Sequence, residues 1–161
     1  MHQRKVGGGN EEDKDYIEVT NDRGILKKII KEGNGENIPI GVTAIVHYTG
    51  KLITGEIFDS SRTRGTPFEF NIGQREVILG WDQGITSMKK GEVSILKITP
   101  EYGYGSRAIG PIPSNSTLLF EVELIDWKKS EDSLFKKLLA VAVLAGFAIY
   151  ILYMRFTKHR D

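Results

Sequence analysis

The sequence predicts an α+β protein: a mainly antiparallel β-sheet with one short helix, followed by a single C-terminal transmembrane helix. Four observations support this. Between residues 17 and 127, short β-branched and aromatic runs are separated by glycine and proline. One short segment in that range has helical character, and one charge-free apolar run lies near the C-terminus. A length of 161 residues suits one hydrophobic core with appendages.

Composition divides the chain into five expected segments. The first has a basic start, a glycine triplet and mixed charges but no apolar run, which excludes a secretory signal and predicts a disordered leader. The charged segment before the apolar run is expected to link domain and membrane. The segments are a leader (1–16), a globular domain (17–128), a linker (129–137), a transmembrane helix (138–154) and a basic tail (155–161).

Five segments of the domain are expected to form strands, because they are rich in β-branched and aromatic residues and are bounded by turn residues. The pattern is clearest in the last, where Leu118, Phe120, Val122 and Leu124 alternate with polar residues and predict a half-buried strand. The expected strands are 25–30, 44–53, 68–72, 93–99 and 117–127.

One short helix is expected at residues 78–86. Gly80 and Gly84 depress its helix propensity, and Gly91 follows two lysines that close the segment. A helix this short depends on tertiary packing, so we expect it to cross the concave face of the sheet.

The apolar run at 138–154 contains no charge and, at 1.5 Å per residue, spans roughly 26 Å as a helix. A buried core helix is the alternative, but such a helix in a small domain normally has a polar stripe. Tyr150, Tyr153 and Arg155 stand where interfacial anchors are found. We therefore expect a membrane span.

The domain is expected to face the cytosol, because no apolar segment precedes the span to start translocation. The modest span length favours the thinner endoplasmic reticulum membrane over the mitochondrial outer membrane. Asn115 begins an Asn-Ser-Thr acceptor pattern, so a glycan on Asn115 in cells would contradict this orientation.

Charge and composition argue against several classes of function. The formal net charge of +1 gives no field for a nucleic-acid partner. The chain has no cysteine and three scattered histidines, so neither a metal site nor a cysteine nucleophile is expected, and His47 is an ordinary strand residue. The run 103–108 matches a dinucleotide fingerprint, but the prolines after it prevent the required helix, so no cofactor is expected.

No nucleophile elbow, glycosidase acid pair or phosphate loop is present, which argues against covalent and phosphoryl chemistry. What remains is a set of aromatic residues among glycines. By composition alone, such residues in a small β domain more often form plain core than a binding pocket.

Five motifs, however, occur in the order and approximate spacing of FKBP-type peptidyl-prolyl isomerases: 46–50 (VHYTG), 58–61 (FDSS), 76–81 (EVILGW), 100–105 (PEYGYG) and 117–124 (TLLFEVEL). Residues 24–127 resemble this family. The resemblance implies a five-stranded antiparallel sheet wrapped around one short helix, with an apolar pocket between them.

Matched residue by residue, the resemblance also implies a site. Trp81 resembles the pocket floor, and Asp59 and Tyr104 resemble its polar rim. Six residues are expected to be catalytic: Tyr48, Phe58, Asp59, Trp81, Tyr104 and Phe120. Four are expected to bind substrate: Phe68, Val77, Ile78 and Ile112.

The implied activity is isomerisation of Xaa-Pro bonds in proline-containing clients, which requires no nucleophile because no covalent bond to the protein forms. The alternative is a tethered binding module that captures proline-containing segments with incidental turnover. Binding of the macrolides tacrolimus and rapamycin is also expected. The loop 106–114 departs from the common family pattern: it is about one residue shorter and has Pro111 where an aliphatic residue is frequent.

Overall fold

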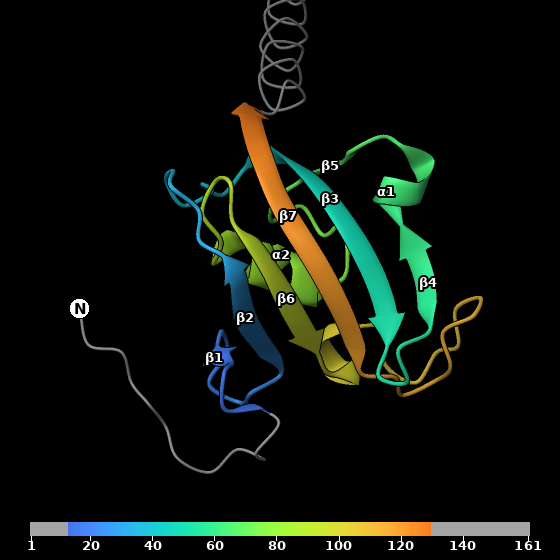
Figure 1. The fold of residues 1–161 in the computed structure, drawn as a ribbon. Coiled ribbons are helices and arrows are strands. Elements are labelled where there is room, and N and C mark those ends of the chain that lie inside the picture. The colour runs from blue at the N-terminus through green and yellow to red at the C-terminus, as the bar shows by residue number, and fades with distance from the viewer. Residues whose placement is uncertain (1–12, 130–161) are drawn as a thin grey trace, which may run out of the picture. The chain divides into compact units, whose positions relative to one another are not determined.

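The alternating apolar pattern folds into a single twisted sheet (Figure 1). The computed structural model describes residues 13–129. The chain divides into two units, 1–128 and 129–161. The first twelve residues of the predicted leader, the predicted linker beyond residue 129, and the predicted span and tail lie outside the described residues. The strands of the described part are β1 (Ile17–Glu18), β2 (Ile25–Lys31), β3 (Val42–Leu52), β4 (Ile57–Ser60), β5 (Phe68–Asn71), β6 (Val93–Ile98) and β7 (Leu118–Lys129).

Strand β7 occupies the middle of the sheet. The strand order is β1-β2-β6-β7-β3-β4, and β5 pairs with β3 beside β4. Strands β6 and β7 run antiparallel, with Leu96 opposite Phe120. The four alternating apolar residues of β7 are all buried, whereas the residues between them are partly exposed. The predicted half-buried strand is confirmed.

The expected number of five strands is wrong, because the described sheet has seven. All five predicted strands are present, with ends shifted by up to two residues. The two additional strands, β1 and β4, have two and four residues and add at the edges of the sheet. Such short strands give too few alternations for a period of two to be recognised in the sequence.

The predicted short helix is confirmed as α2 (Leu79–Thr86), which lies against one face of the sheet (Figure 1). The two glycines that weaken it as a helix allow it to approach the sheet closely. A Cβ atom at Gly80 would lie 2.5 Å from Ile98 Cγ2, and one at Gly84 would lie 2.8 Å from Leu96 Cδ1. Two further short helices, α1 (Ser61–Arg64) and a 3-10 helix (Pro100–Tyr102), were not predicted.

A buried ion pair fastens the end of α2 to the sheet. Lys27 Nζ lies 3.0 Å from Glu92 Oε1 and donates a 2.7 Å hydrogen bond to the Ser87 carbonyl. The other oxygen of Glu92 accepts from the Lys89 N–H, and Ser94 Oγ donates to Glu92 Oε1. Both charged side chains are over nine-tenths buried, and each has at least two polar partners.

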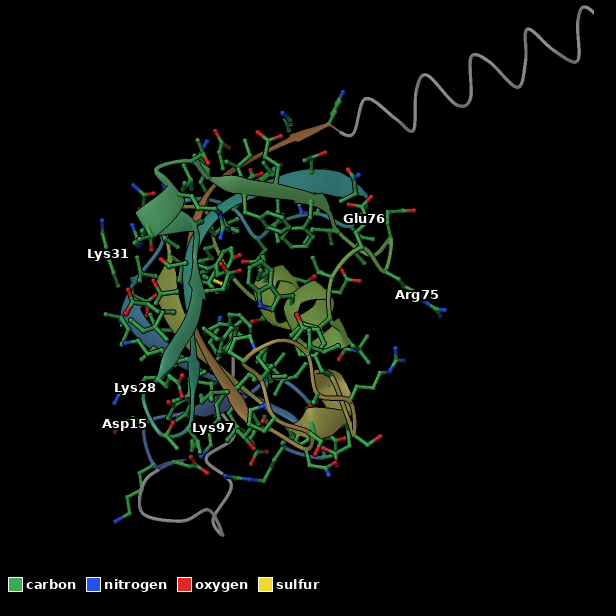
Figure 2. All side chains as sticks on the ribbon, turned by 90° about the vertical axis from the view of Figure 1, so that its right-hand side faces the viewer. Asp15, Lys28, Lys31, Arg75, Glu76 and Lys97 are labelled. Atoms are coloured by element: carbon green, nitrogen blue, oxygen red, sulfur yellow. The ribbon has the colours of Figure 1, made fainter. Side chains whose placement is uncertain are left out.

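Ordered contacts begin before the first strand, inside the segment expected to be a leader. Asp13 pairs with Lys97 of β6 at 2.8 Å, and Asp15 pairs with Lys28 of β2 at 2.9 Å. Asp15, Lys28 and Lys97 lie on the same side of the domain in Figure 2. Within residues 13–129, no helix has both the length and the apolar character needed to cross a membrane.

Candidate active site

Trp81 is the centre of the site. It is the third residue of α2, and its side chain is buried, with 4% of the residue exposed. The rings of Tyr48 and Phe120 meet it edge to face, at centroid distances of 4.9 and 5.2 Å. Among the described residues, its indole N–H is the one buried side-chain polar atom without a hydrogen-bond partner. Ring packing therefore holds this floor in place.

Aromatic walls rise from four different strands around this floor. Tyr48 comes from β3, Phe58 from β4, Phe68 from β5 and Phe120 from β7. Phe58 packs edge to face on Phe120 at 5.5 Å, and Phe68 lies 5.9 Å from both Tyr48 and Trp81. Edge-to-face contacts of this kind add to the stabilisation from apolar burial, so the rings support one another around the floor.

The loop between β5 and α2 supplies a third side of the site. Its residues Val77 and Ile78 are half-buried. The carboxylate of Asp82, in the first turn of α2, accepts hydrogen bonds from the N–H groups of Gly73 at 3.0 Å and Arg75 at 3.3 Å. Figure 2 shows Arg75 and Glu76 on this loop.

Glu76, near the C-terminal end of the same loop, binds back to the start of the loop. Its carboxylate accepts from both the backbone N–H and the side-chain amide of Asn71, each at 2.8 Å. The loop is thus fixed on both sides of Ile78. The Ile78 N–H, just before the first turn of α2, donates no hydrogen bond within residues 13–129.

A three-residue polar network forms the rim. The Tyr48 hydroxyl donates to Asp59 Oδ2, and Arg64 donates from Nη1 to Asp59 Oδ1 and from Nη2 to the Tyr48 hydroxyl at 2.9 Å. Burial acts to raise the pKa of Asp59, but the hydrogen bonds from Tyr48 and Arg64 outweigh it and hold that pKa below its usual value. Burial, reinforced by Asp59, raises the pKa of Tyr48. At neutral pH, Asp59 is therefore an acceptor and Tyr48 a neutral donor.

Tyr104 also lines the pocket, just after the 3-10 helix. Burial, with a smaller contribution from the charge of Asp59, raises its pKa, so its hydroxyl stays protonated. Within the described part of the chain, this hydroxyl makes no hydrogen bond, and 37% of the residue is exposed. It is thus a second donor without a partner at the mouth of the site.

These side chains enclose one pocket of about 400 Å³. The ten residues expected from the sequence to form the site all lie on its wall. Sequence reasoning missed four others: Glu76, Ile109, Gly110 and Pro111. It also missed Arg64, which reaches the pocket only through Asp59 and Tyr48. The motif containing Glu76 and the short loop containing Pro111 were both noted in the sequence, but neither residue was assigned to the site.

The arrangement offers little for proton transfer or metal chemistry. Asp59 is committed to two donors, and the His47 ring contacts Ser61 Oγ at 2.9 Å, away from the residues that line the pocket. In residues 13–129, no three His, Asp or Glu side chains gather as a metal site would require. The pocket can surround an apolar group with rings and offer hydrogen-bond donors at its edge.

Comparison with known proteins agrees with this geometry. Residues 35–125 match the sequence model of the family described as FKBP-type peptidyl-prolyl cis-trans isomerase. The chain is 54% identical over 106 residues to FK506-binding protein 1 of Dictyostelium discoideum, covering 65% of this chain and 99% of that protein. It is 51% identical over 104 residues to a peptidyl-prolyl cis-trans isomerase of Schizosaccharomyces pombe, covering 63% of this chain and 93% of that protein.

A solved structure agrees as well. The crystal structure of AtFKBP13 superposes with a TM-score of 0.66 at 38% identity, covering 70% of this chain and 98% of that one. Fold, pocket and sequence thus lead to one conclusion: the chain belongs to the FKBP-type peptidyl-prolyl cis-trans isomerase family.

Proposed function

We propose that this isomerase speeds rotation about Xaa-Pro bonds by holding the proline amide in a dry aromatic pocket. One observation supports this proposal: a pocket floored by Trp81 and walled by aromatic rings has two hydrogen-bond donors, the Ile78 N–H and the Tyr104 hydroxyl, without partners in the described part of the chain. The five-membered proline ring fits an apolar cavity of this kind.

The physics of the amide explains why a dry pocket is effective. Amide resonance makes the bond planar and places partial negative charge on the oxygen, and rotation breaks that resonance at a barrier of about 18–20 kcal/mol. Water stabilises the polar planar form more than the twisted form. A pocket that excludes water removes this preference and lowers the barrier relative to solution.

The two donors hold the substrate on one side of the bond while the other side turns. A hydrogen bond to the oxygen of the rotating amide would favour the planar form, so we assign the Ile78 N–H and the Tyr104 hydroxyl to carbonyls outside that amide. Each such bond contributes about 1 kcal/mol. Asp59 orders the rim through Tyr48 and Arg64 and moves no proton.

An isomerisation assay tests this function. The full chain in detergent is mixed with an Xaa-Pro peptide, with and without rapamycin. We expect turnover that rapamycin abolishes. Peptide binding without turnover would favour the tethered binding module. The absence of both binding and turnover would contradict the proposed function.

Macrolide binding is part of the proposal. Relatives of this chain are named FK506-binding proteins, and the pocket residues matched to the family line one cavity. We expect tacrolimus and rapamycin to compete with the peptide for this cavity. Titration calorimetry with each drug checks this, and a rapamycin complex that leaves peptide turnover intact would argue against a shared site.

We also propose that a helix at residues 138–154 tethers the domain to a membrane, with the domain in the cytosol. The support is the charge-free sequence followed by Arg155. Leu144→Arg places a charge in the middle of the run, at a cost of about 2.5–3.5 kcal/mol for insertion. We expect the full chain to stay in the membrane fraction after an alkaline wash and Leu144→Arg to be released, with Leu144→Ile as the control.

Orientation and compartment need a separate measurement. Tags at both ends of the full chain, probed by protease in intact cells and isolated membranes, would show which side the domain faces. We expect the N-terminal tag to be protected in intact cells but digested in isolated membranes. We also expect the chain to be found in the endoplasmic reticulum. Asn115 is exposed in the structure, so a glycan there would contradict the cytosolic orientation.

A further inference from the structure

The loop that carries Ile78 begins at Asn71, the last residue of β5. Asn71 is half-buried and lies outside the pocket lining. Its side-chain oxygen accepts a 2.7 Å hydrogen bond from the Thr43 hydroxyl of β3. Its side-chain nitrogen and its backbone N–H each donate a 2.8 Å hydrogen bond to the Glu76 carboxylate. Asn71 therefore connects strand β3 to the far end of the loop.

The Glu76 carboxylate fixes the direction in which the Asn71 amide points. An amide has a donor NH2 group on one side and an acceptor oxygen on the other, whereas a carboxylate is an acceptor alone. The NH2 group therefore faces Glu76, and the oxygen is left facing β3. Thr43 lies directly opposite Asn71 in the β3–β5 ladder and donates to that oxygen. Both polar atoms of the side chain thus have a complementary partner.

Two clamps share this loop. The Asp82 carboxylate accepts from two backbone N–H groups in its first half. The hydrogen bonds from Asn71 to Glu76 hold the second half, two residues before Ile78. Hydrogen bonds to an ionised acceptor are stronger than those between neutral groups, so the second clamp is a firm one. Displacing Glu76 would therefore also displace the Ile78 N–H.

We propose that Asn71 is a positioning residue of this isomerase: through Glu76 it places the Ile78 N–H for the substrate carbonyl. The inference rests on the proposed function, which assigns that N–H to the substrate. Without the clamp, binding must order the loop, which corresponds to about a two- to tenfold rise in KM. The hydrogen bond from Ile78 is present in bound substrate and in the transition state alike, so kcat should change little.

Exchanging donor and acceptor isolates the hydrogen bonds from other effects of substitution. Asn71→Asp sets two carboxylates against each other, and like charges repel. Glu76→Gln leaves two donors of Asn71 facing one acceptor oxygen. The double variant carries the net charge of the wild type and can form a complementary pair again. In it, the new amide donates to the new carboxylate and accepts from the backbone N–H of position 71.

The experiment measures kcat and KM of the full chain in detergent for one Xaa-Pro peptide. The variants are Asn71→Asp, Glu76→Gln, their combination and Thr43→Val. Gln74→Ala is the matched control, because Gln74 is exposed in the same loop and lies outside the pocket lining. Urea unfolding of each variant checks folding, and Thr43→Val, which adds no charge, serves if Asn71→Asp does not fold. The amide-proton resonance of Ile78 is followed by NMR as the peptide is added.

We expect KM to rise about two- to tenfold in each single variant of the clamp and by less in Thr43→Val. It should return near the wild-type value in the double variant, with kcat nearly constant and Gln74→Ala unchanged. The Ile78 amide proton should shift downfield when peptide binds to the wild type. That shift should shrink in the single variants and recover in the double variant.

Three results would overturn this inference alone, given an active wild type. The first is wild-type kinetics in Asn71→Asp and Thr43→Val. The second is a double variant as impaired as Asn71→Asp. The third is a fall in kcat that follows the unfolded fraction while KM stays constant, which would show a purely structural role. A wild type without turnover would contradict the proposed function and this inference with it.

Discussion

Two kinds of polar side chain stand at the pocket rim. Asp59 is held by Tyr48 and Arg64, whereas the Tyr104 hydroxyl has no partner within residues 13–129. Tyr104→Phe removes one hydrogen bond to substrate and is expected to lower kcat/KM about two- to tenfold. Asp59→Val leaves Tyr48 and Arg64 without their acceptor, and the loss should exceed tenfold, as roughly 1.5–3 kcal/mol is expected for a charged hydrogen bond.

Phe58→Tyr provides a further comparison, because it adds a hydroxyl to an aromatic wall that packs on Phe120. It should lower kcat/KM more than Tyr104→Phe does, since a polar atom in the dry pocket is costly. Steady-state kinetics on one peptide checks all three variants. Equal and negligible effects in all of them would refute the assignment of these residues.

The pH dependence follows from the same rim. The pKa of folded Asp59 lies below its usual value of 3.8, so its contribution to stability is present above that value and is lost as pH falls through the lower, folded pKa. The pKa values of Tyr48 and Tyr104 are raised, so both hydroxyls stay neutral. We expect kcat/KM to be flat from about pH 5 to about pH 9, measured in constant ionic strength. A bell-shaped profile would indicate acid-base catalysis and contradict the mechanism.

At the residue scale, most of the predicted site residues lie inside the recognised motifs, and most of the missed ones lie outside them. Trp81 and Tyr104 are examples of the first kind. Arg64 is an example of the second, because it lies just outside the 58–61 motif and its contact with Asp59 depends on the short helix α1, which was not predicted. Ile109 and Pro111 line the pocket because the loop 106–114 closes into a tight turn. The sequence showed only that this loop departs from the family pattern, not that it forms a turn.

At the scale of the elements, α2 depends on close contact with the sheet. A Cβ at Gly84 would lie 2.8 Å from Leu96 Cδ1, and Leu96 is fully buried. Gly84→Ala would gain up to about 1 kcal/mol of helix propensity but lose about 1–3 kcal/mol to overpacking, so we expect net destabilisation. Because Trp81 is on the same helix, kcat/KM should fall as well.

Urea unfolding and kinetics check this prediction, with Gln83→Ala as the control. Gln83 is exposed on the same helix, so its replacement should leave both quantities nearly unchanged. A more stable Gly84→Ala variant would show that the gain in helix propensity outweighs the overpacking against Leu96, and would contradict this prediction.

The elements could be predicted where a periodic pattern was long enough. Strand β7 alternates over twelve residues, and its pattern was sufficient. Strand β4 has four residues and a register shift opposite Gly50 and Lys51, which hides any period of two. Strand β1 depends on pairing with β2 and has no pattern of its own. Short edge elements are determined by their neighbours, so sequence alone did not reveal them.

At the scale of the whole described domain, the buried pair Lys27 and Glu92 ties β2, β6 and the end of α2 together. Glu92→Gln leaves the Lys27 charge buried without a countercharge. We expect a loss of about 3 kcal/mol in the free energy of unfolding, measured with urea. Glu123→Gln, in a partly exposed ion pair with Arg62, is the control and should cost less than about 1 kcal/mol. A loss of similar size in both variants would contradict a special role for the buried pair.

The antiparallel sheet with its helix was predictable at this scale, because the five sequence motifs occur in the order and approximate spacing of one known family. The buried ion pair was not, because lysine and glutamate are normally exposed and nothing in the local pattern marks Lys27 or Glu92 as internal. Their burial becomes visible only when three elements converge.

The most direct test of the central claim is an infrared measurement on the bound substrate. An Xaa-Pro peptide labelled with ¹³C at the carbonyl before proline is bound to the full chain, and the carbonyl stretch is compared with that in water. A carbonyl removed from water and left without a hydrogen bond should absorb at higher frequency in the pocket. A frequency equal to or lower than that in water would mean that the oxygen remains hydrogen-bonded, and the dry-pocket mechanism would be wrong.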